Sequence, residues 1–426
     1  MVVPALDCLV DVLGASWLKL SGFTFTETMD GDNYHHEGVE GAGAMYARAG
    51  WRYGGDALRL KGAEHCTIER NRFYALGCNA IYLAGHNFRN LIQDNEISYA
   101  GANGICLLGT RHKHPMFNQV TDNYIHHIGA LNKYVAGVFL GMSDGNLVAH
   151  NRIEHVPHHA VNLSNNPTGR NIVEYNLIRH ACQEINDTGA INSWMEQPAS
   201  QDAERDGHLI RYNYIADTFS FRAAYGKVGK EMGWTNGIYL DNYTSNSFIY
   251  GNIIVRCQNG IQLHAGKNNM IENNIFVNCL NNLTSMQGYG FPYWRDMQGF
   301  MTGNHVVRNN FYQTAPAAVV YGLNRGWTER TFAQCDDNLF FQPDGGKYAL
   351  QDTRKVQEAE RIGTLEQWRR LGYDRRSVVV DPLFVRPDND DYRLRPDSPA
   401  LKLGFVPIDV TKIGPRSARK RDLEDR

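Results

Sequence analysis

Two aspartates stand at the edges of short apolar segments that are typical of strands. Asp187 opens "DTGAINSW", and Asp241 closes "GIYLD". Two carboxyl groups are what hydrolysis of a glycosidic bond needs, because one protonates the leaving oxygen while the other attacks or activates water. In "GIYLD", Ile238 and Leu240 should point inward, so we expect Tyr239 and Asp241 to face outward and Asp241 to be exposed. Each acid alone is equally well explained as a capping or solvated side chain, so the hypothesis rests on the pair.

Glu184 lies three positions before Asp187, a spacing that makes neighbours on a helix. This segment predicts a turn that leads into a strand, so the two acids need not work together. Several other polar and aromatic side chains near the aspartates are candidates for substrate binding or for tuning the site. These candidates are Glu184, His159, Trp194, Trp234, Tyr239 and His264.

A repeated template must supply the scaffold for these residues. It has a β-branched residue, two variable residues, Asn, one variable residue, and then Ile or Phe, as in "VTDNYI" and "IENNIF". The repeated asparagines are Asn71, Asn95, Asn123, Asn151, Asn176, Asn213, Asn252, Asn274 and Asn309. Because an Asn amide can bond to the same residue one coil away, we interpret these residues as scaffold and not as catalysts.

A second pattern follows each template several residues later. It includes "NAIYL", "NGICL", "AGVFL", "HAVNL", "NGIYL" and "NGIQL", which alternate as strands do. No unit contains a helix long enough for a crossover between parallel strands, so the units must stack on one another. The sequence therefore predicts an all-β fold, a right-handed parallel β-helix (solenoid) of about eleven coils with a C-terminal cap.

Departures from the repeat define the expected organisation. We predict a β-helix over 1–326, a terminal coil and cap over 327–415 with a short helix in "TLEQWRRLGY", and a charged tail over 416–426 that is solvated. Insertions are expected at about 28–55, 195–207, 219–235 and 287–303. Their aromatic residues and glycines favour a wall that stacks on sugar rings, although a dimer contact would look similar.

Composition excludes several classes of function. A net charge of −2 gives no field that would attract nucleic acid. No run of about 18 apolar residues occurs, so we expect no transmembrane helix. The first 20 residues lack a basic region and are interrupted by Asp7 and Asp11, which argues against a signal peptide. Localisation and oligomeric state stay open.

Cysteine and histidine spacing give little reason to expect a metal or another cofactor. No CxxC or CxxH spacing occurs, and Cys257 and Cys279 each follow their Asn by five residues, which predicts an interior stack. His127, His155 and His180 each follow their Asn by four residues, so we expect a vertical row at one turn. A turn ladder explains this row better than a catalytic groove.

The motifs "EYNLIRHACQEINDTGAINSW", "GIYLDNYTSNSFIYGNII" and "VVVDPLFVRPDNDDYRLRPDSPALKLGF" resemble glycoside hydrolase family 141, over roughly residues 15–415. The resemblance implies hydrolysis of complex polysaccharides, of the α-L-fucosidase or xylanase kind, with Asp187 and Asp241 as the catalytic carboxylates. Asn192 stands where this family more often has an aromatic residue, so we add it to the substrate-binding candidates. The resemblance also implies a protein that is usually exported.

Two other functions remain open. A polysaccharide lyase or epimerase on the same fold would use a Lys, Arg or His base, for which Arg222, Lys227 and Lys230 are candidates. A noncatalytic carbohydrate-binding rod would need the aromatic residues but not the pair of acids. Carbohydrate is the expected partner in all three cases.

Overall fold

The computed structural model describes most of the chain in two units. The described residues are Leu6 and 8–29, 55–110, 112–166, 169–195, 207–220, 234–286, 300–314, 319–323, 328–342, 349–352 and 363–416. Unit 1 comprises Met1–Glu196, Thr218–Thr235 and Lys412–Arg426, and unit 2 comprises Gln197–Asp217 and Asn236–Thr411. Most of each predicted insertion, together with Arg222, Lys227 and Lys230, lies outside the described residues.

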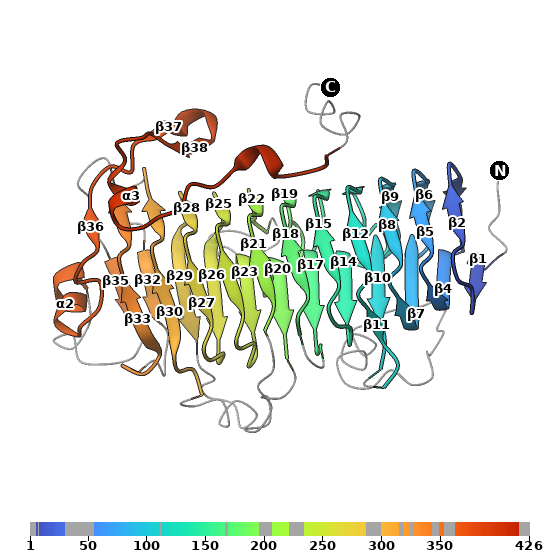
Figure 1. Cartoon of the computed structure of the whole chain (residues 1–426), viewed down its shortest axis with the longest axis horizontal. Coiled ribbons are helices and arrows are strands. Elements are labelled where there is room, and N and C mark those ends of the chain that lie inside the picture. The colour runs from blue at the N-terminus through green and yellow to red at the C-terminus, as the bar shows by residue number, and fades with distance from the viewer. Residues whose placement is uncertain are drawn as a thin grey trace. The chain divides into compact units, whose positions relative to one another are not determined.

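Unit 1 is a stack of three-stranded coils whose strands form three parallel sheets (Figure 1). Sheet A contains β1 (Cys8–Leu13), β4 (Asp56–Glu64), β7 (Ile81–Phe88), β10 (Ile105–Leu108), β14 (Ala136–Gly141), β17 (His159–Ser164) and β20 (Thr188–Trp194), with β11 (Pro115–Met116) beside β7. Sheet B contains β2 (Lys19–Ser21), β5 (Thr67–Glu69), β8 (Leu91–Gln93), β12 (Gln119–Thr121), β15 (Leu147–Ala149) and β18 (Ile172–Glu174). Sheet C contains β3 (Thr24–Thr26), β6 (Arg72–Leu76), β9 (Glu96–Ala100), β13 (Tyr124–His126), β16 (Arg152–Glu154) and β19 (Leu177–Arg179).

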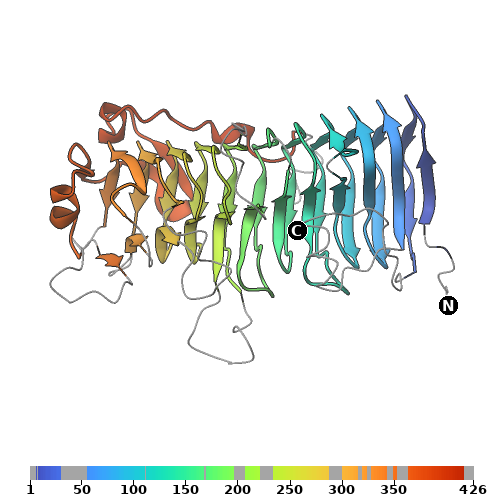
Figure 2. The same ribbon diagram turned by 90° about the horizontal axis from the view of Figure 1, so that it is seen from below.

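Unit 2 repeats the same arrangement, and its strands also lie side by side in Figure 2. Sheet A here contains β23 (Thr235–Asp241), β26 (Asn259–His264), β29 (Asn281–Met286), β32 (Val319–Leu323) and β35 (Ala349–Asp352). Sheet B contains β21 (Leu209–Arg211), β24 (Phe248–Tyr250), β27 (Met270–Glu272), β30 (Asn304–Val307) and β33 (Phe332–Asp336). Sheet C contains β22 (Tyr214–Ala216), β25 (Ile253–Val255), β28 (Ile275–Val277), β31 (Asn310–Tyr312), β34 (Leu339–Phe341) and β36 (Val378–Val379).

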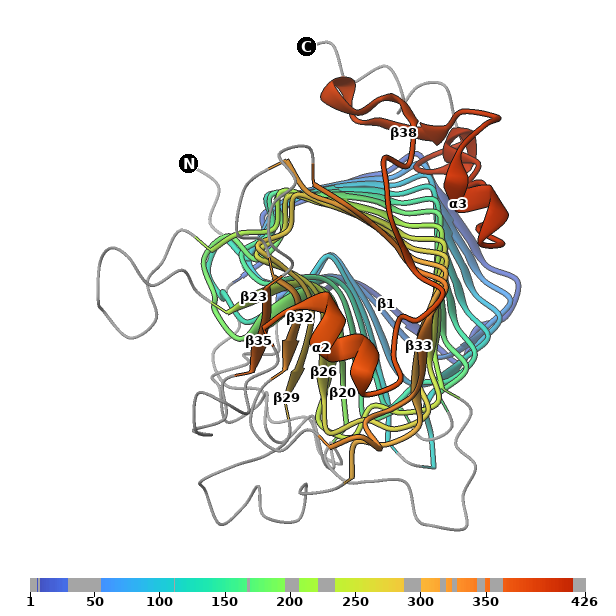
Figure 3. The ribbon, with the colours of Figure 1, turned by 90° about the vertical axis from the view of Figure 1, so that its left-hand side faces the viewer.

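The predicted fold class, an all-β parallel β-helix, is therefore confirmed. Each coil has one strand in each sheet, so the coils of a unit superpose when they are viewed end-on (Figure 3). Inward residues stack in columns, and in unit 1 the columns of sheet B and sheet C include Ile92 above Ile68 and Ile97 above Phe73. All four side chains are fully buried. Stacked apolar side chains of this kind provide most of the stabilisation, because burial scales with apolar area.

The repeated asparagines occupy the turn between sheets B and C, as predicted. Asn123 is typical: its Oδ1 accepts hydrogen bonds from the N–H and the Nδ2 of Asn95, at 3.0 Å each. Its own Nδ2 donates to Asn151 Oδ1, also at 3.0 Å. The preceding residue, Asp122, has a left-handed φ of 57°. The asparagine amides thereby satisfy one another and the adjacent backbone although the turn is buried.

A second ladder, which the sequence analysis missed, lies at the turn between sheets A and B. In unit 1, Asn90, Asn118 and Asn146 are linked in the same way, with the Nδ2 of each donating to the next Oδ1 at 3.0 Å. Asn146 continues to Asn171 at 3.1 Å. The signal was present, because each of these residues stands five positions before an asparagine of the first ladder.

The predicted row of histidines is also confirmed. The rings of His127 and His155 stack with centroids 4.7 Å apart, and those of His155 and His180 stack at 4.8 Å. Burial and the neighbouring imidazoles lower the pKa of His155. Cys257 and Cys279 are both buried, and burial with the adjacent Cys257 thiol raises the pKa of Cys279. They match the predicted interior stack.

The last coils of unit 2 end in the short helix α2 (Leu365–Arg370), within the stretch predicted to be helical. Thr364 and Gln367 form a capping box at its start. Trp368 is fully buried against Tyr321, and its Nε1 donates to Asp374 at 2.9 Å. Burial raises the pKa of Asp374. The helix thus covers apolar side chains at the end of the solenoid.

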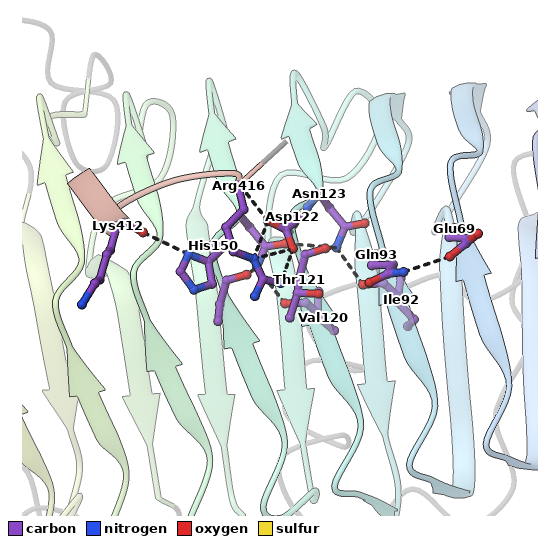
Figure 4. A network of polar contacts seen from close by, with 12 residues as sticks. Glu69, Ile92, Gln93, Val120, Thr121, Asp122, Asn123, His150, Lys412 and Arg416 are labelled. Carbon is purple, nitrogen blue, oxygen red and sulfur yellow. Dashed lines mark hydrogen bonds and ion pairs between the residues drawn. The ribbon is translucent and has the colours of Figure 1, made fainter. Parts of the chain in front are cut away.

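The chain then runs along the outside of sheet C through β37 (Phe384–Arg386), η4 (Pro387–Asn389), β38 (Asp391–Leu394), α3 (Pro399–Lys402) and η5 (Val410–Lys412). In unit 2, Arg256 binds Asp217 at 2.7 Å and Asp390 at 2.7 Å, which fixes the hairpin to the coils. In unit 1, Arg416 forms an ion pair with Asp122 (Figure 4). Arg416 is the first residue of the predicted charged tail, and residues 417–426 lie outside the described part of the chain.

No described helix is long and apolar enough to cross a membrane.

Candidate functional site

The nominated polar residues lie on sheet A and at its edges, in one cluster in each unit. The outward positions of the sheet can be followed by register: Phe139 pairs with Asn162, and Asn162 pairs with Asn192. From β7 to β14 the column is apolar, because Tyr82, Cys106 and Phe139 belong to a buried hydrophobic cluster. Its first two positions, on β1 and β4, are instead the ion pair of Asp11 and Arg59. The outward column of unit 1 therefore changes from apolar to polar at β17.

In unit 1 the polar cluster joins β17 and β20. Asn192 Nδ2 donates to Asn162 Oδ1 at 3.1 Å, and Ser164 Oγ donates to the same oxygen at 3.1 Å. His159 Nδ1 lies 2.9 Å from the carbonyl oxygen of Gly189 and 2.9 Å from Thr188 Oγ1. A carbonyl oxygen only accepts, so Nδ1 carries a hydrogen.

A buried histidine packs against this cluster. The rings of His158 and His159 have centroids 3.6 Å apart, and Tyr134 packs edge-on against His158 at 5.0 Å. Burial, with a smaller contribution from His159, lowers the pKa of His158 well below its ordinary value. His158 is therefore neutral at physiological pH and acts as a packing residue here.

The two acids nominated in unit 1 differ in their surroundings. Asp187 is exposed and immediately precedes β20, in a left-handed conformation with φ of 57°. Glu184 is partly exposed and forms an ion pair with Lys133 Nζ at 2.9 Å. Asp187 is the acid at the entrance of the strand, and Glu184 contributes to the turn before it.

In unit 2 the structure brings together two nominated residues, Asp241 and His264. They end the neighbouring strands β23 and β26, and His264 Nδ1 lies 2.7 Å from Asp241 Oδ1. The N–H of Asn242 donates to the same oxygen at 2.8 Å. Thr244 Oγ1 donates to the carbonyl oxygen of Asp241 at 2.7 Å, which closes the turn after the strand. Asp241 is thus held by a local turn and by a histidine from the next coil.

Exposure separates the nominated residues into two groups. The Asp241 side chain is 19% exposed, so it is less open than the sequence predicted. Trp234 is 36% exposed. Tyr239, which the alternation predicted to face outward beside Asp241, is buried at 2% exposure, and the other nominated residues that are buried are His159, Asn192, Trp194 and His264. The buried residues support the strands, whereas Asp187, Glu184, Trp234 and Asp241 are accessible for contact with a ligand.

Two polar residues of the site were missed by the sequence analysis. Gln262 is fully buried opposite Tyr239 in the register of β23 and β26, and Asn162 bonds to Asn192. Their signal was the fourth letter of the repeated strand pattern, which is Tyr, Cys or Phe in "NAIYL", "NGICL" and "AGVFL" but polar in "HAVNL" and "NGIQL".

Within the described residues, no group of three or more His, Cys, Asp or Glu side chains is arranged to hold a metal ion. What the geometry offers is acid–base chemistry. A carboxylate that accepts hydrogen bonds from a histidine and a backbone N–H can act as a base or a nucleophile, and the histidine keeps it in one orientation.

Comparisons with known proteins agree with this architecture. The family described as "Right handed beta helix region" matches residues 56–191 and 204–338. No curated protein sequence matches the chain. Among solved structures, the A-module of the mannuronan C-5 epimerase AlgE6 of Azotobacter vinelandii is 11% identical, with a TM-score of 0.48 over 77% of this chain and 84% of that chain. A PL6 family polysaccharide lyase of Pseudopedobacter saltans is 14% identical, with a TM-score of 0.44 over 85% of this chain and 95% of that one.

A protein described as a glycoside hydrolase is also similar, at 13% identity and a TM-score of 0.34. The match covers 53% of this chain but only 35% of that hydrolase, so the chain corresponds to about a third of its length. At these identities the likeness concerns the fold.

Proposed function

The chain belongs to the right-handed β-helix family, and we propose that it is a glycoside hydrolase. The proposed substrate is a complex polysaccharide or oligosaccharide, of the kind cleaved by α-L-fucosidases or xylanases. Asp187 and Asp241 are the proposed catalytic carboxylates. The sequence resemblance to glycoside hydrolase family 141 supports this assignment.

The observation that carries the proposal is the contact between Asp241 and His264. Asp241 Oδ1 lies 2.7 Å from His264 Nδ1 and accepts a hydrogen bond from the Asn242 N–H, so the carboxyl group is held in one orientation as an acceptor. We therefore assign Asp241 the role of base or nucleophile. Asp187, the exposed acid in unit 1, is the proposed proton donor to the leaving oxygen.

His264 is a positioning residue in this proposal. Its Nδ1 contacts Asp241 from the next strand, and its side chain is 4% exposed, so the ring itself is held by packing. A rigid partner of this kind keeps the carboxylate in a productive orientation, which is a common way of preparing a site before the substrate binds.

A lyase or epimerase is the second candidate, and the same contact favours it. Removal of a proton next to a uronate carboxyl group needs a general base, and the accessible group that could serve is Asp241, which His264 orients. The two functions differ in product, because a hydrolase releases new reducing ends whereas a lyase leaves an unsaturated sugar.

The test is an assay of the purified wild type, Asp187→Asn and Asp241→Asn against a panel of neutral and acidic glycans. We expect new reducing ends with the wild type and a loss of about 10³-fold in each variant. Glu272→Gln is the matched control, because Glu272 also accepts from a basic partner, Arg308, but lies on sheet B. Ultraviolet absorbance of an unsaturated product would identify a lyase instead. Equal activity in the wild type and both Asp variants would contradict the assignment.

A further inference from the structure

The turn between sheets A and B carries a row of aromatic and basic side chains in unit 1. One position in each turn adopts a left-handed conformation, and in the first coils it is occupied by Trp17, His65, Arg89 and Phe117, with φ between 52° and 63°. We call these four residues the corner row. Bulky side chains are costly there, by about 1 kcal/mol or more per residue, because the Cβ crowds the backbone.

The same position in unit 2 is occupied by residues that adopt this conformation easily. They are Asn246, Asn268 and Gly303, with φ of 56°, 55° and 69°. The backbone therefore does not require large side chains at this turn. The conformation of the turn by itself therefore does not explain the tryptophan, the histidine, the arginine and the phenylalanine of unit 1.

The rings of the corner row are presented outward. Trp17 is 76% exposed and stacks on His65 with centroids 4.4 Å apart, so its other face is open. Phe117 is 51% exposed and packs edge-on against Phe88 at 5.8 Å. A Cβ at Gly145 would lie 2.6 Å from the Phe117 ring, so the glycine is what allows this ring to lie flat on the turn.

A surface cavity of about 540 Å³ lies along the last three residues of the row. Its lining includes His65, Arg89 and Phe117 together with Gln119 and Leu147. A volume of this size is within the usual range for small-ligand sites. Successive coils are about 4.8 Å apart, a spacing close to the length of one pyranose unit, so an extended chain of sugars could place successive rings along successive coils.

The charge of the cavity indicates which sugars would fit. Among the described lining residues, Arg89 alone has a permanent charge, and its guanidinium lies 4.9 Å from the centre of the Phe88 ring. The nearby acid Glu64 is paired with His86 Nε2 at 2.8 Å. An arginine beside open aromatic faces matches a sugar that has an apolar ring face and a carboxylate.

We propose that the corner row is a binding surface for an acidic polysaccharide, a chain that contains uronate residues. Trp17 and Phe117 stack on the sugar rings, and Arg89 pairs with a carboxylate. The surface anchors the polymer and performs no chemistry. The inference does not rest on the proposed hydrolase activity, because it would hold equally for a noncatalytic protein.

The aromatic residues at the opposite turn provide the matched control. Tyr99 is also left-handed and 47% exposed, but its ring stacks on His127 at 5.4 Å, and the histidines behind it stack on one another. The Tyr99 ring also packs edge-on against Tyr74 at 5.6 Å, so it has ring neighbours in the coils on both sides, whereas Trp17 has one stacked ring neighbour.

The experiment is affinity electrophoresis of the full chain in gels containing polygalacturonate, with dextran gels as the neutral reference. All proteins carry Asp241→Asn, so that cleavage does not remove the polymer. We expect polygalacturonate to retard the parent protein, and we expect Trp17→Ala with Phe117→Ala to weaken binding by at least about 10-fold. Arg89→Gln should weaken it about 10-fold and reduce its salt dependence. Tyr99→Ala should bind as the parent does.

A further variant separates binding from folding. Trp17→Tyr with Phe117→Tyr keeps flat rings at both positions and should retain binding, whereas Trp17→Asn with Phe117→Asn should lose binding without a lower Tm, because Asn suits the left-handed turn. Equal retardation of the parent and the alanine variant would overturn the proposal, as would equal retardation in the dextran gel. Self-association that is lost with Trp17→Ala would identify the row as a contact between copies of the chain. Cleavage assays on short oligosaccharides test the hydrolase separately.

Discussion

The asparagine ladders and the outward positions of sheet A use polar residues in opposite ways. In the ladders the same residue recurs from coil to coil, and each amide is fully bonded: Asn123 accepts from Asn95 and donates to Asn151. On sheet A the outward residue changes from coil to coil, from Phe139 to Asn162 and Asn192 in unit 1. Repetition indicates a structural role, and variation on the same scaffold indicates a place where function was added.

This contrast predicts that the two regions can be damaged independently. Substitutions in a ladder should reduce the free energy of unfolding and leave the activity of the folded protein unchanged. Substitutions of outward residues at the ends of the sheet A strands should reduce the activity and leave the free energy of unfolding nearly unchanged.

The largest effect is expected for Asp241→Asn. The change keeps the size of the side chain and its ability to accept from Asn242, but it removes the charge that a base or nucleophile needs. We expect kcat/KM to fall about 10³-fold, which corresponds to about 4 kcal/mol, while Tm changes by a few degrees at most. A large fall in Tm would show that Asp241 has a structural role, and would contradict the distinction between the ladders and the outward residues of sheet A.

Asn123→Ala should have the largest effect on stability. It removes the acceptor of the Asn95 N–H and Nδ2 and the donor to Asn151 inside a buried turn. Each lost hydrogen bond costs about 1 kcal/mol or more, so we expect the free energy of unfolding to fall by about 3 to 4 kcal/mol. Urea denaturation gives the measurement. Asn162→Ala, an asparagine outside the ladders, is the comparison, and an equal loss there would remove the distinction.

A third prediction concerns Asp56, the acid at the head of a short chain of amides on sheet A. Asn79 Nδ2 donates to Asp56 Oδ1 at 2.8 Å, and Asn103 Nδ2 donates to Asn79 at 2.8 Å. Burial raises the pKa of Asp56 to about 6, although Asn79 and Arg59 act in the other direction. The ordinary pKa of an aspartate is about 3.9, so the folded state holds this proton more tightly than the unfolded state.

The sign of the effect follows from linkage. Because the folded protein binds more protons between pH about 4 and 6, its stability falls as the pH rises through this range, by up to about 3 kcal/mol. Asp56→Asn keeps the acceptor for Asn79 and removes the charge. We expect the variant to be more stable than the wild type at pH 7 and to lose this advantage towards pH 4.5. Urea denaturation of both proteins at pH 7 and pH 4.5 gives the measurement. A stability difference between wild type and variant that is the same at both pH values would show that burial does not raise the pKa of Asp56.

A smaller effect on catalysis is expected for His264→Gln. Glutamine can still donate to Asp241 but lacks the rigid ring, so orientation of the carboxylate is weakened and not abolished. We expect kcat to fall about 10-fold with little change in KM. Lys133→Met, which removes the partner of Glu184 at the turn, should change kcat by less than this. A loss equal to that of Asp241→Asn would assign His264 to the chemistry itself.

Much of the fold could be predicted because a β-helix is built from repeated contacts between neighbouring coils. Each coil contacts only its neighbours, so the repeat of Asn123 and its equivalents specified the turn, the stacking and the fold class. The row of His127, His155 and His180 followed from the same spacing. The second ladder through Asn118 could have been predicted in the same way, since each of its asparagines stands five positions before one of the first ladder.

The candidate site was predicted only in part. Asp241 and His264 were both nominated, yet nothing in their spacing in the sequence indicated that they touch. The alternation in "GIYLD" correctly predicted that Ile238 and Leu240 are buried in the interior. Tyr239 points to the opposite face of the strand, yet it is buried as well. Alternation tells which face of a strand a residue occupies, and it contains no information about what packs on that face.

By itself the sequence determined the coil, its ladders and the positions that are open to variation, because these depend on contacts between equivalent residues at short, regular distances along the chain. Only the tertiary structure decided that His264 holds Asp241, that Arg416 binds Asp122 and that Trp17 and Phe117 form one row beside Arg89. These contacts join residues that are distant in sequence or that belong to different turns, so they depend on which coils come to lie next to one another and on the rotamers that packing selects.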